Sequence, residues 1–252
     1  MRDHTHATYP PLGTLKPVAE NIWIVDGPVI RFGPRWLAMP FPTRTTVIRA
    51  ANGALFIHSP TPLQPQLKQE LERTGSVKWL IAPNRLHYWW LPAWRREFPE
   101  AQTFLAPRVR EQAGGHIDFT AEPLDRMEGY PWDAEIATLP IAGRYMTEVV
   151  FFHRASRTLV LTDLIENFER GKLASPFQLV LAWLGGALDP HGSTPRDMRM
   201  TYGRQELRAA VETMLAWNPE RIIFAHGRWY ERDGASELRR AFAWLLKEKI
   251  RT

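Results

Sequence analysis

Short apolar runs, interrupted by polar residues and turn formers, recur along most of the chain. Runs of four to six residues bounded by glycine, proline, asparagine or aspartate are typical of β-strands. We therefore predict strands at 21–25, 29–32, 45–49, 54–57, 77–82, 103–106, 148–153, 159–161 and 221–225. Asp26-Gly27 is expected to form a turn, and Asn52-Gly53 is typical of a β-hairpin. Residues 1–19 are polar and contain proline, so we expect a loosely held N-terminal arm.

Helical spacing separates these strands. Thr61, with a proline and a glutamine after it, is suited to begin a helix, and Gly75 is suited to end it. Further helices are predicted after Pro92, once within 108–133, at 176–188, at 205–217 and from 236 to about 250. The chain is therefore predicted to contain two successive halves, each with strands followed by helices. It contains no proline-, serine- or glycine-rich spacer, so residues 1–252 are expected to form one α/β domain.

Composition adds further expectations. Cysteine is absent, which excludes disulfides and thiolate ligands. The N-terminus lacks the apolar core of a secretory signal, so a cytoplasmic location is expected. The net charge of +5 is spread over many elements, which favours a solvated surface over a nucleic-acid binding track. The apolar run 176–188 is shorter than the roughly 20 residues that span a bilayer. It suits a helix over a site, a dimer contact or a shallow membrane contact, and no transmembrane segment is expected.

Three of the predicted strands end at residues that can bind a metal. His87 follows the run 77–82, Asp163 follows 159–161, and His226 follows 221–225. Ligands collect at the carboxyl ends of strands in sheets that are flanked by helices. We therefore expect these three side chains to converge, and two imidazoles with a carboxylate suit Zn²⁺ or Fe²⁺.

Four sequence motifs resemble, in the same order, motifs of the metallo-β-lactamase superfamily. The superfamily loop T-H-x-H-x-D-H corresponds to the segment that ends at His87, and its F-P-x-A motif corresponds to Phe98-Pro-Glu-Ala101. The segment 143–163 and Ala225-His-Gly227 resemble its later motifs. The resemblance spans roughly residues 18–230 and implies a four-layer αββα sandwich. Phrases such as A-P-N-x-x-H resemble a branch that is filed as a domain of unknown function.

The same resemblance shows where this chain departs from the superfamily. Ala82 and Asn84 take the places of its first two histidines, Leu86 that of its aspartate, and Arg144 that of a later metal-binding histidine. This pattern implies loss of one metal site and retention of a second, with His87, Asp163 and His226 holding one Zn or Fe ion. The implied activity is that of a mononuclear metal-dependent hydrolase. Its substrate, an anionic small molecule, would be oriented by Asn84, Arg144 and His191 beneath an insertion at 164–204.

Other interpretations of these residues stay open. Arg144 could replace the lost metal by pairing with Asp163, in a non-catalytic descendant that binds an anionic metabolite. The histidines, Asp163 and Asn84 could instead only satisfy one another, or the run 176–188 could serve as an interaction module. His58 is either a partner of the His87 loop or an ordinary residue at a strand end. Trp89, Trp90 and Trp94 either wall a pocket or pack beneath it, and packing is the preferred interpretation.

Overall fold

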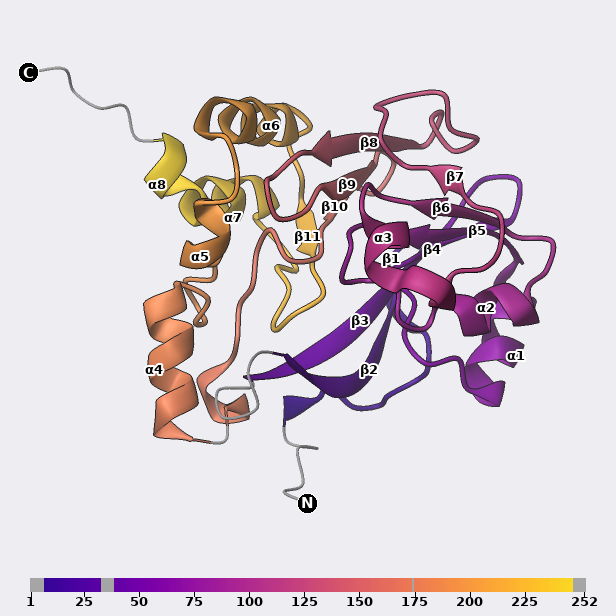
Figure 1. The fold of residues 1–252 in the computed structure, drawn as a ribbon, viewed down its shortest axis with the longest axis horizontal. Helices are drawn as coiled ribbons and strands as arrows, with labels where there is room; N and C mark the ends of the chain where they lie inside the picture. Colours follow the sequence, from indigo (N-terminus) through magenta and orange to yellow (C-terminus); the bar gives the residue numbers. More distant parts are fainter. Residues whose placement is uncertain (1–6, 33–38, 174, 247–252) are drawn as a thin grey trace, which may run out of the picture.

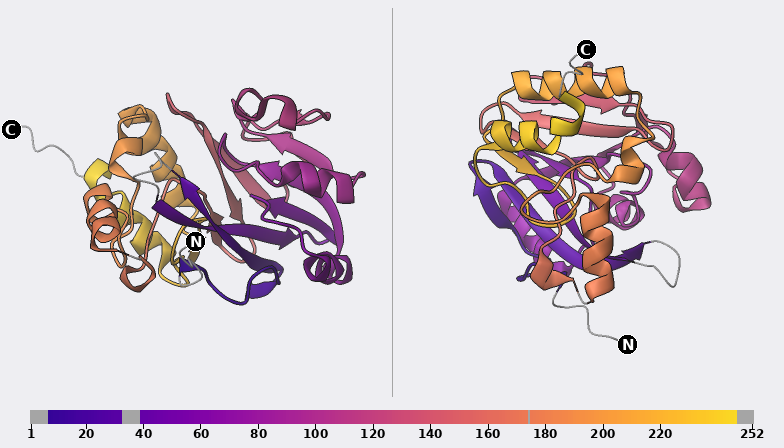
Figure 2. Two further views of the ribbon diagram at one scale, coloured as in Figure 1. Left: turned by 60° about the horizontal axis from the view of Figure 1, so that its bottom comes forward. Right: turned by 90° about the vertical axis from the view of Figure 1, so that its left-hand side faces the viewer.

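The computed structural model describes residues 7–32, 39–173 and 175–246. Two β-sheets are stacked face to face, and helices cover the outer face of each (Figures 1 and 2). Apolar side chains of both sheets meet in one buried cluster. In that cluster Val149 and Phe151 of the second sheet lie with Phe56 and Leu80 of the first. The chain has the expected αββα sandwich.

The first sheet begins as an antiparallel meander and continues as a parallel sheet. Its strands, in spatial order, are β1 (Lys16–Ala19), β2 (Ile22–Phe32), β3 (Met39–Arg49), β4 (Ala54–His58), β5 (Ser76–Ala82), β6 (Gln102–Leu105) and β7 (Glu122–Pro123). The parallel half needs crossover connections, which run through α1 (Pro65–Thr74), α2 (Leu91–Glu97) and α3 (Val109–Ala113). A single 3₁₀ turn, Gly114–His116, follows α3.

The second sheet has the spatial order β11 (Arg221–Ile223), β10 (Thr158–Val160), β9 (Glu148–His153) and β8 (Ile136–Ile141). Only β10 and β11 are parallel. Its outer face packs against α6 (Arg204–Ala216), α7 (Gly234–Ala241) and α8 (Ala243–Leu246). The segment 164–204 contains a 3₁₀ turn (Arg170–Lys172), α4 (Pro176–Gly185) and α5 (Arg196–Arg199). None of the helices in the described part of the chain is long and apolar enough to cross a membrane.

The expected turn at Asp26-Gly27 is wrong, because β2 continues through it with an irregular register between Asp26 and Val29. The buried Asp26 carboxylate lies 2.7 Å from the Arg44 guanidinium on the neighbouring strand. A Cβ atom on Gly27 would lie 2.5 Å from the hydroxyl of Thr43. A glycine and a buried ion pair therefore produce a bulge at a position where the sequence suggests a turn.

The N-terminal arm is held more firmly than expected in its described part. Gly13 donates a backbone hydrogen bond to Asp26, and the hydroxyl of Thr14 and the amide of Leu15 donate to the Glu70 carboxylate at 2.8 and 2.7 Å. Strand β1 then pairs with β2. These contacts fix the arm on α1 and the sheet edge, whereas residues 1–6 lie outside the described residues.

Two predicted helix boundaries also differ. The first helix begins at Pro65, because the backbone and hydroxyl of Thr61 bond to Thr45 and do not cap the helix. The last predicted helix is divided at the buried Phe242 into α7 and α8, and its part beyond 246 lies outside the described residues. Between the strands predicted at 29–32 and 45–49, residues 39–44 already belong to β3, and residues 33–38 lie outside the described residues.

Candidate metal centre

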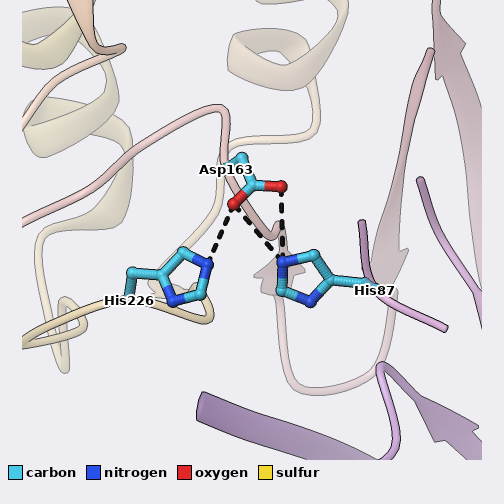
Figure 3. Close-up of side chains that lie close together, drawn as sticks. All are labelled: His87, Asp163 and His226. Carbon is cyan, nitrogen blue, oxygen red and sulfur yellow. Dashed lines mark hydrogen bonds and ion pairs between the residues drawn. The ribbon is translucent and has the colours of Figure 1, made fainter. Parts of the chain in front are cut away.

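His87, Asp163 and His226 lie together at one end of the two sheets. His87 is in the loop after β5, and Asp163 and His226 each follow the end of a strand of the second sheet by three residues. One ligand atom from each residue can be chosen so that all three lie within 4.8 Å of one another. Figure 3 shows the carboxylate facing both imidazole rings. The structure thus brings together the three residues that were expected to converge.

Asp163 is the centre of this group. Its Oδ1 lies 2.9 Å from Nε2 of His226, and both of its oxygens lie 3.3 Å from Nε2 of His87. Asp163 and His226 are buried and His87 is partly buried. Burial alone would raise the pKa of the Asp163 carboxyl, but the charge and hydrogen bonds of the two imidazoles outweigh it and lower that pKa. Asp163 is therefore a carboxylate at neutral pH.

The outer nitrogens of both rings have partners that orient the histidines. Nδ1 of His226 lies 2.8 Å from the carbonyl oxygen of Pro42, to which it donates. Nδ1 of His87 lies 2.7 Å from the Ser59 hydroxyl. Such outer contacts fix the ring orientation of metal-binding histidines. In both residues Nε2 is the nitrogen that faces the site.

Asn84 connects the His87 loop to Asp163. Its side-chain oxygen accepts hydrogen bonds from the backbone amides of Leu86 and His87 at 2.8 and 3.2 Å. Its amide nitrogen donates to Asp163 Oδ2 at 2.6 Å and to the Thr162 hydroxyl at 2.9 Å. Asn84 is fully buried and does not line the cavity described below, where it was expected to contact the substrate. It positions the site residues instead.

Glu148, at the start of β9, holds the loop that carries Asp163. Its buried carboxyl accepts hydrogen bonds from the backbone amides of Thr162 at 2.7 Å and Asp163 at 3.0 Å. Burial, and then the negative charge of Asp163, raise the pKa of Glu148 to about 7. Glu148 was not predicted as a site residue from the sequence, although an acidic residue at the start of an apolar strand is a visible signal.

A cavity of about 720 Å³ opens onto the three residues. Strands β2 and β3, the His87 loop and the segment 164–204 form its walls. Most of the lining side chains are apolar, among them Ile30, Met39, Phe41, Leu86, Trp89, Trp90, Met146, Phe168, Leu181, Leu184 and Met198. Trp94 is fully buried in the core, and Trp90 both packs against the core and lines the cavity. Trp89 is exposed and lines the cavity, so the packing interpretation fails for Trp89 alone of these three tryptophans.

Four charged side chains also line the cavity, namely Asp163, Glu166, Asp197 and Arg196. Glu166 is buried, whereas Asp197 and Arg196 are exposed. Burial, and then the negative charges of Asp163 and Asp197, raise the pKa of Glu166 well above its usual range. No sequence motif marked Glu166 or Arg196, because both belong to the segment 164–204, which has no counterpart among the motifs.

Arg144 and His191 are exposed, and neither lines the cavity. The backbone amide of Arg144 donates to Thr201 at 2.7 Å, but its guanidinium forms no hydrogen bond or ion pair within the described residues. The pairing of Arg144 with Asp163, one of the interpretations left open by the sequence, is not formed. Asn84 and the two imidazoles already surround the carboxylate.

His58 is buried, and within the described residues neither of its ring nitrogens has a hydrogen-bond partner. Its ring packs edge to face on Phe151, with 5.5 Å between the ring centroids. Burial, with a smaller effect of His87, lowers the pKa of His58 to about 3, so the ring is neutral. The possible hydrogen bond from His58 to the His87 loop is not formed.

Comparison with known proteins agrees with this architecture. The crystal structure of the DIM-1 metallo-β-lactamase exposed to ceftazidime is similar over 93% of this chain and 98% of its own, with 14% identity and a TM-score of 0.62. The mono-zinc form of the metallo-β-lactamase FIM-1 from Pseudomonas aeruginosa is similar over 93% and 96%, with 12% identity and a TM-score of 0.56. Rubredoxin oxygen:oxidoreductase from Desulfovibrio gigas is similar over 92% and 61%, with 10% identity and a TM-score of 0.59.

At these identities the structural similarity shows the fold alone. No curated protein matches the chain. Residues 22–182 match the family described as a domain of unknown function, DUF4336. The chain belongs to this family and is a divergent member of the metallo-β-lactamase fold.

Proposed function

We propose that the chain is a mononuclear metal-dependent hydrolase that holds one Zn or Fe ion at His87, Asp163 and His226. The observation that carries this proposal is the convergence of their ligand atoms within 4.8 Å at a cavity of about 720 Å³. Two imidazole nitrogens and a carboxylate oxygen are the donor set that these metals accept in hydrolytic sites. Bound there, the metal would lower the pKa of a water molecule and polarise the bond to be cleaved.

The protein residues around this group support its role. Ser59 and the carbonyl of Pro42 keep both Nε2 atoms directed inward, and Asn84 holds the Asp163 carboxylate in place. Glu166 lines the cavity, and burial, with the nearby negative charges, raises its pKa well above the usual range, which favours the protonated form. We assign it the transfer of a proton to the leaving group, since a buried acid of this kind is suited to general acid catalysis.

The walls of the cavity suggest the class of substrate. Most of the lining is apolar, and Arg196 is the one lysine or arginine among the described lining residues. The proposed substrate therefore has an apolar body and an anionic group that lies near Arg196. Arg196 takes the role that the sequence suggested for Arg144 and His191.

Metal analysis tests the first part of the proposal. Protein purified without chelator, or stripped and reloaded with Zn²⁺ or Fe²⁺, should contain about one equivalent of metal per chain. His226→Ala and Asp163→Asn should abolish stoichiometric binding. His191→Ala is a matched control, because this histidine is exposed and lies outside the cavity. Failure to bind stoichiometric metal, or equal binding by His226→Ala, would show that the group is not a metal site.

Turnover tests the second part. The loaded protein should hydrolyse activated carboxylate or phosphate esters with apolar leaving groups, and both chelation and Asp163→Asn should remove this activity. Glu166→Gln should keep the metal but lower the rate by about 10²- to 10⁴-fold on an ester whose alkoxide leaving group needs a proton, the range for loss of a general acid, and much less on the activated esters. Stoichiometric metal without metal-dependent hydrolysis of any ester would exclude the hydrolase and support a non-catalytic binding protein.

A further inference from the structure

Helix α4 (Pro176–Gly185) exposes an apolar stripe at the surface of the protein. The helix contains no charged residue. Phe177, Val180, Trp183 and Leu184 are 53%, 50%, 62% and 48% exposed. Residues three, four and seven positions apart lie on one face of a helix, so these four side chains form a continuous stripe.

The opposite face of α4 is also mostly apolar, with Gln178 as the one polar side chain of the helix. Ala182 is buried in a small cluster with Phe168 and Leu188, and Leu181 lines the cavity. A surface helix normally has a polar outer face, and a helix that is apolar all round is covered on every side by protein or lipid. In Figure 1, α4 stands at the left-hand margin of the molecule, and in the right-hand view of Figure 2, which is seen from that side, it faces the viewer with no described helix or strand in front of it.

We propose that the outer stripe of α4 and the adjoining mouth of the cavity bind the surface of an anionic lipid membrane. A second copy of the chain fits this stripe less well. A helix of ten residues is about 15 Å long and presents on the order of 150 to 300 Å², whereas a stable interface buries about 800 Å² per partner. Shallow insertion needs no larger area, and tryptophan and phenylalanine are favoured at the membrane interface.

Charge favours an anionic surface. The chain has a net charge of +5. Arg196, on α5 beside α4, is exposed and forms no ion pair or hydrogen bond within the described residues. Asp197 on the same short helix is the acidic neighbour that reduces this local charge. Basic residues near a membrane surface strengthen the binding of anionic lipids.

The stripe also leads into the cavity. Leu184 is exposed on α4 and lines the cavity, and Trp89, which is 46% exposed, lines it from the His87 loop. An apolar path therefore runs from the proposed membrane surface towards the candidate metal centre. The proposed membrane contact depends only on α4 and its neighbours, so membrane binding does not require a bound metal.

Sedimentation with lipid vesicles tests the proposal. Wild-type protein should sediment with vesicles of phosphatidylcholine and phosphatidylglycerol, and more weakly with phosphatidylcholine alone. The double variant Phe177→Ser/Trp183→Ser should bind at least tenfold more weakly, because two large apolar side chains no longer leave water. Met127→Ser is the matched control, since Met127 is 57% exposed in the loop between β7 and β8. In Figure 1, β7 lies on the opposite side of the molecule from α4.

Each outcome decides the question. Loss of binding in the double variant, with Met127→Ser unchanged and the melting temperatures of all proteins alike, supports the proposal. If the double variant is less stable, Val180→Ser alone is used and should weaken binding in the same direction. Absence of vesicle binding by the wild type, or equal binding by the α4 variants, overturns the proposal. A wild-type dimer in light scattering that the double variant lacks also overturns it, in favour of self-association. Chelator should leave vesicle binding unchanged, which separates this test from that of the metal centre.

Discussion

Asn84→Asp is the substitution that most directly tests the contacts around Asp163. Aspartate has nearly the same shape as asparagine and keeps an acceptor for the backbone amides of Leu86 and His87. It replaces the donor that lies 2.6 Å from Asp163 Oδ2 by a second carboxylate oxygen. Two carboxylates at this distance cannot both be ionised, so the folded variant must retain one proton.

The size of the effect follows from that proton. An aspartate in the unfolded chain has a pKa of about 3.9, and the introduced carboxyl has a raised pKa in the folded state. Below about pH 3.9 this carboxyl is protonated in both states and does not reduce the unfolding free energy of the variant. Above that pH the unfolding free energy falls by about 1.36 kcal/mol per pH unit. The variant should lose up to about 4 kcal/mol at pH 7 and only about 1.5 kcal/mol at pH 5, relative to wild type.

Urea unfolding at pH 5, 6 and 7 in the presence of chelator measures these differences. Asn52→Asp is a matched control, because Asn52 is exposed in the β3–β4 hairpin and its side-chain oxygen accepts from Ala54 at 3.0 Å. This control should change the unfolding free energy by no more than about 0.5 kcal/mol. Equal stability of the two variants at pH 7, or a loss in Asn84→Asp that does not depend on pH, would refute the inferred contact with an ionised Asp163.

Three further predictions concern the surroundings of the site. Arg44→Met should lower the unfolding free energy by about 3 to 5 kcal/mol in urea. Asp26 loses its buried partner and keeps only the partly exposed Lys16, and the carbonyls of Phe224 and Gly227 lose a buried donor. A loss below about 1 kcal/mol would contradict this. Glu148 has a pKa raised to about 7, so its stabilising contribution is complete below about pH 4.5 and is lost as the pH rises through 7. Glu148→Gln should flatten the pH profile of stability in this range, and an equally steep profile would contradict the assignment. Ser59→Ala removes the outer partner of His87 and should weaken metal binding by about 10- to 100-fold in calorimetry, whereas unchanged affinity would mean that Ser59 does not orient the ring.

The convergence of the three ligand residues could be predicted from the sequence because its determinants are local. His87, Asp163 and His226 each follow a short apolar run, and such runs become strands whose carboxyl ends meet at one edge. The order of strands and helices follows from the same local periodicity. The αββα sandwich was in turn identified through motifs that lie at these strand ends.

Contacts between distant residues could not be predicted in this way. The Asp26 bulge depends on Arg44 in the next strand, and the role of Glu148 depends on its burial beneath the Asp163 loop. Arg144 occupies the position of a lost histidine in the motif, yet its side chain is exposed. A position in a motif fixes the backbone location of a residue, but the direction of a long side chain depends on which neighbours are already paired.

The contacts of Asp163 also determine how protons and metal compete for the site. His226 donates its Nδ1 hydrogen to Pro42, so its Nε2 can donate to Asp163 only if the ring carries a second proton. The same nitrogen can bind a metal only with its lone pair free. Metal binding should therefore release protons, and metal affinity should rise with pH. Calorimetric titration with Zn²⁺ in two buffers of different ionisation enthalpy measures this release. Equal apparent enthalpies in the two buffers, with an affinity that does not change between pH 6 and pH 8, would show that no protonated nitrogen faces Asp163 before the metal binds.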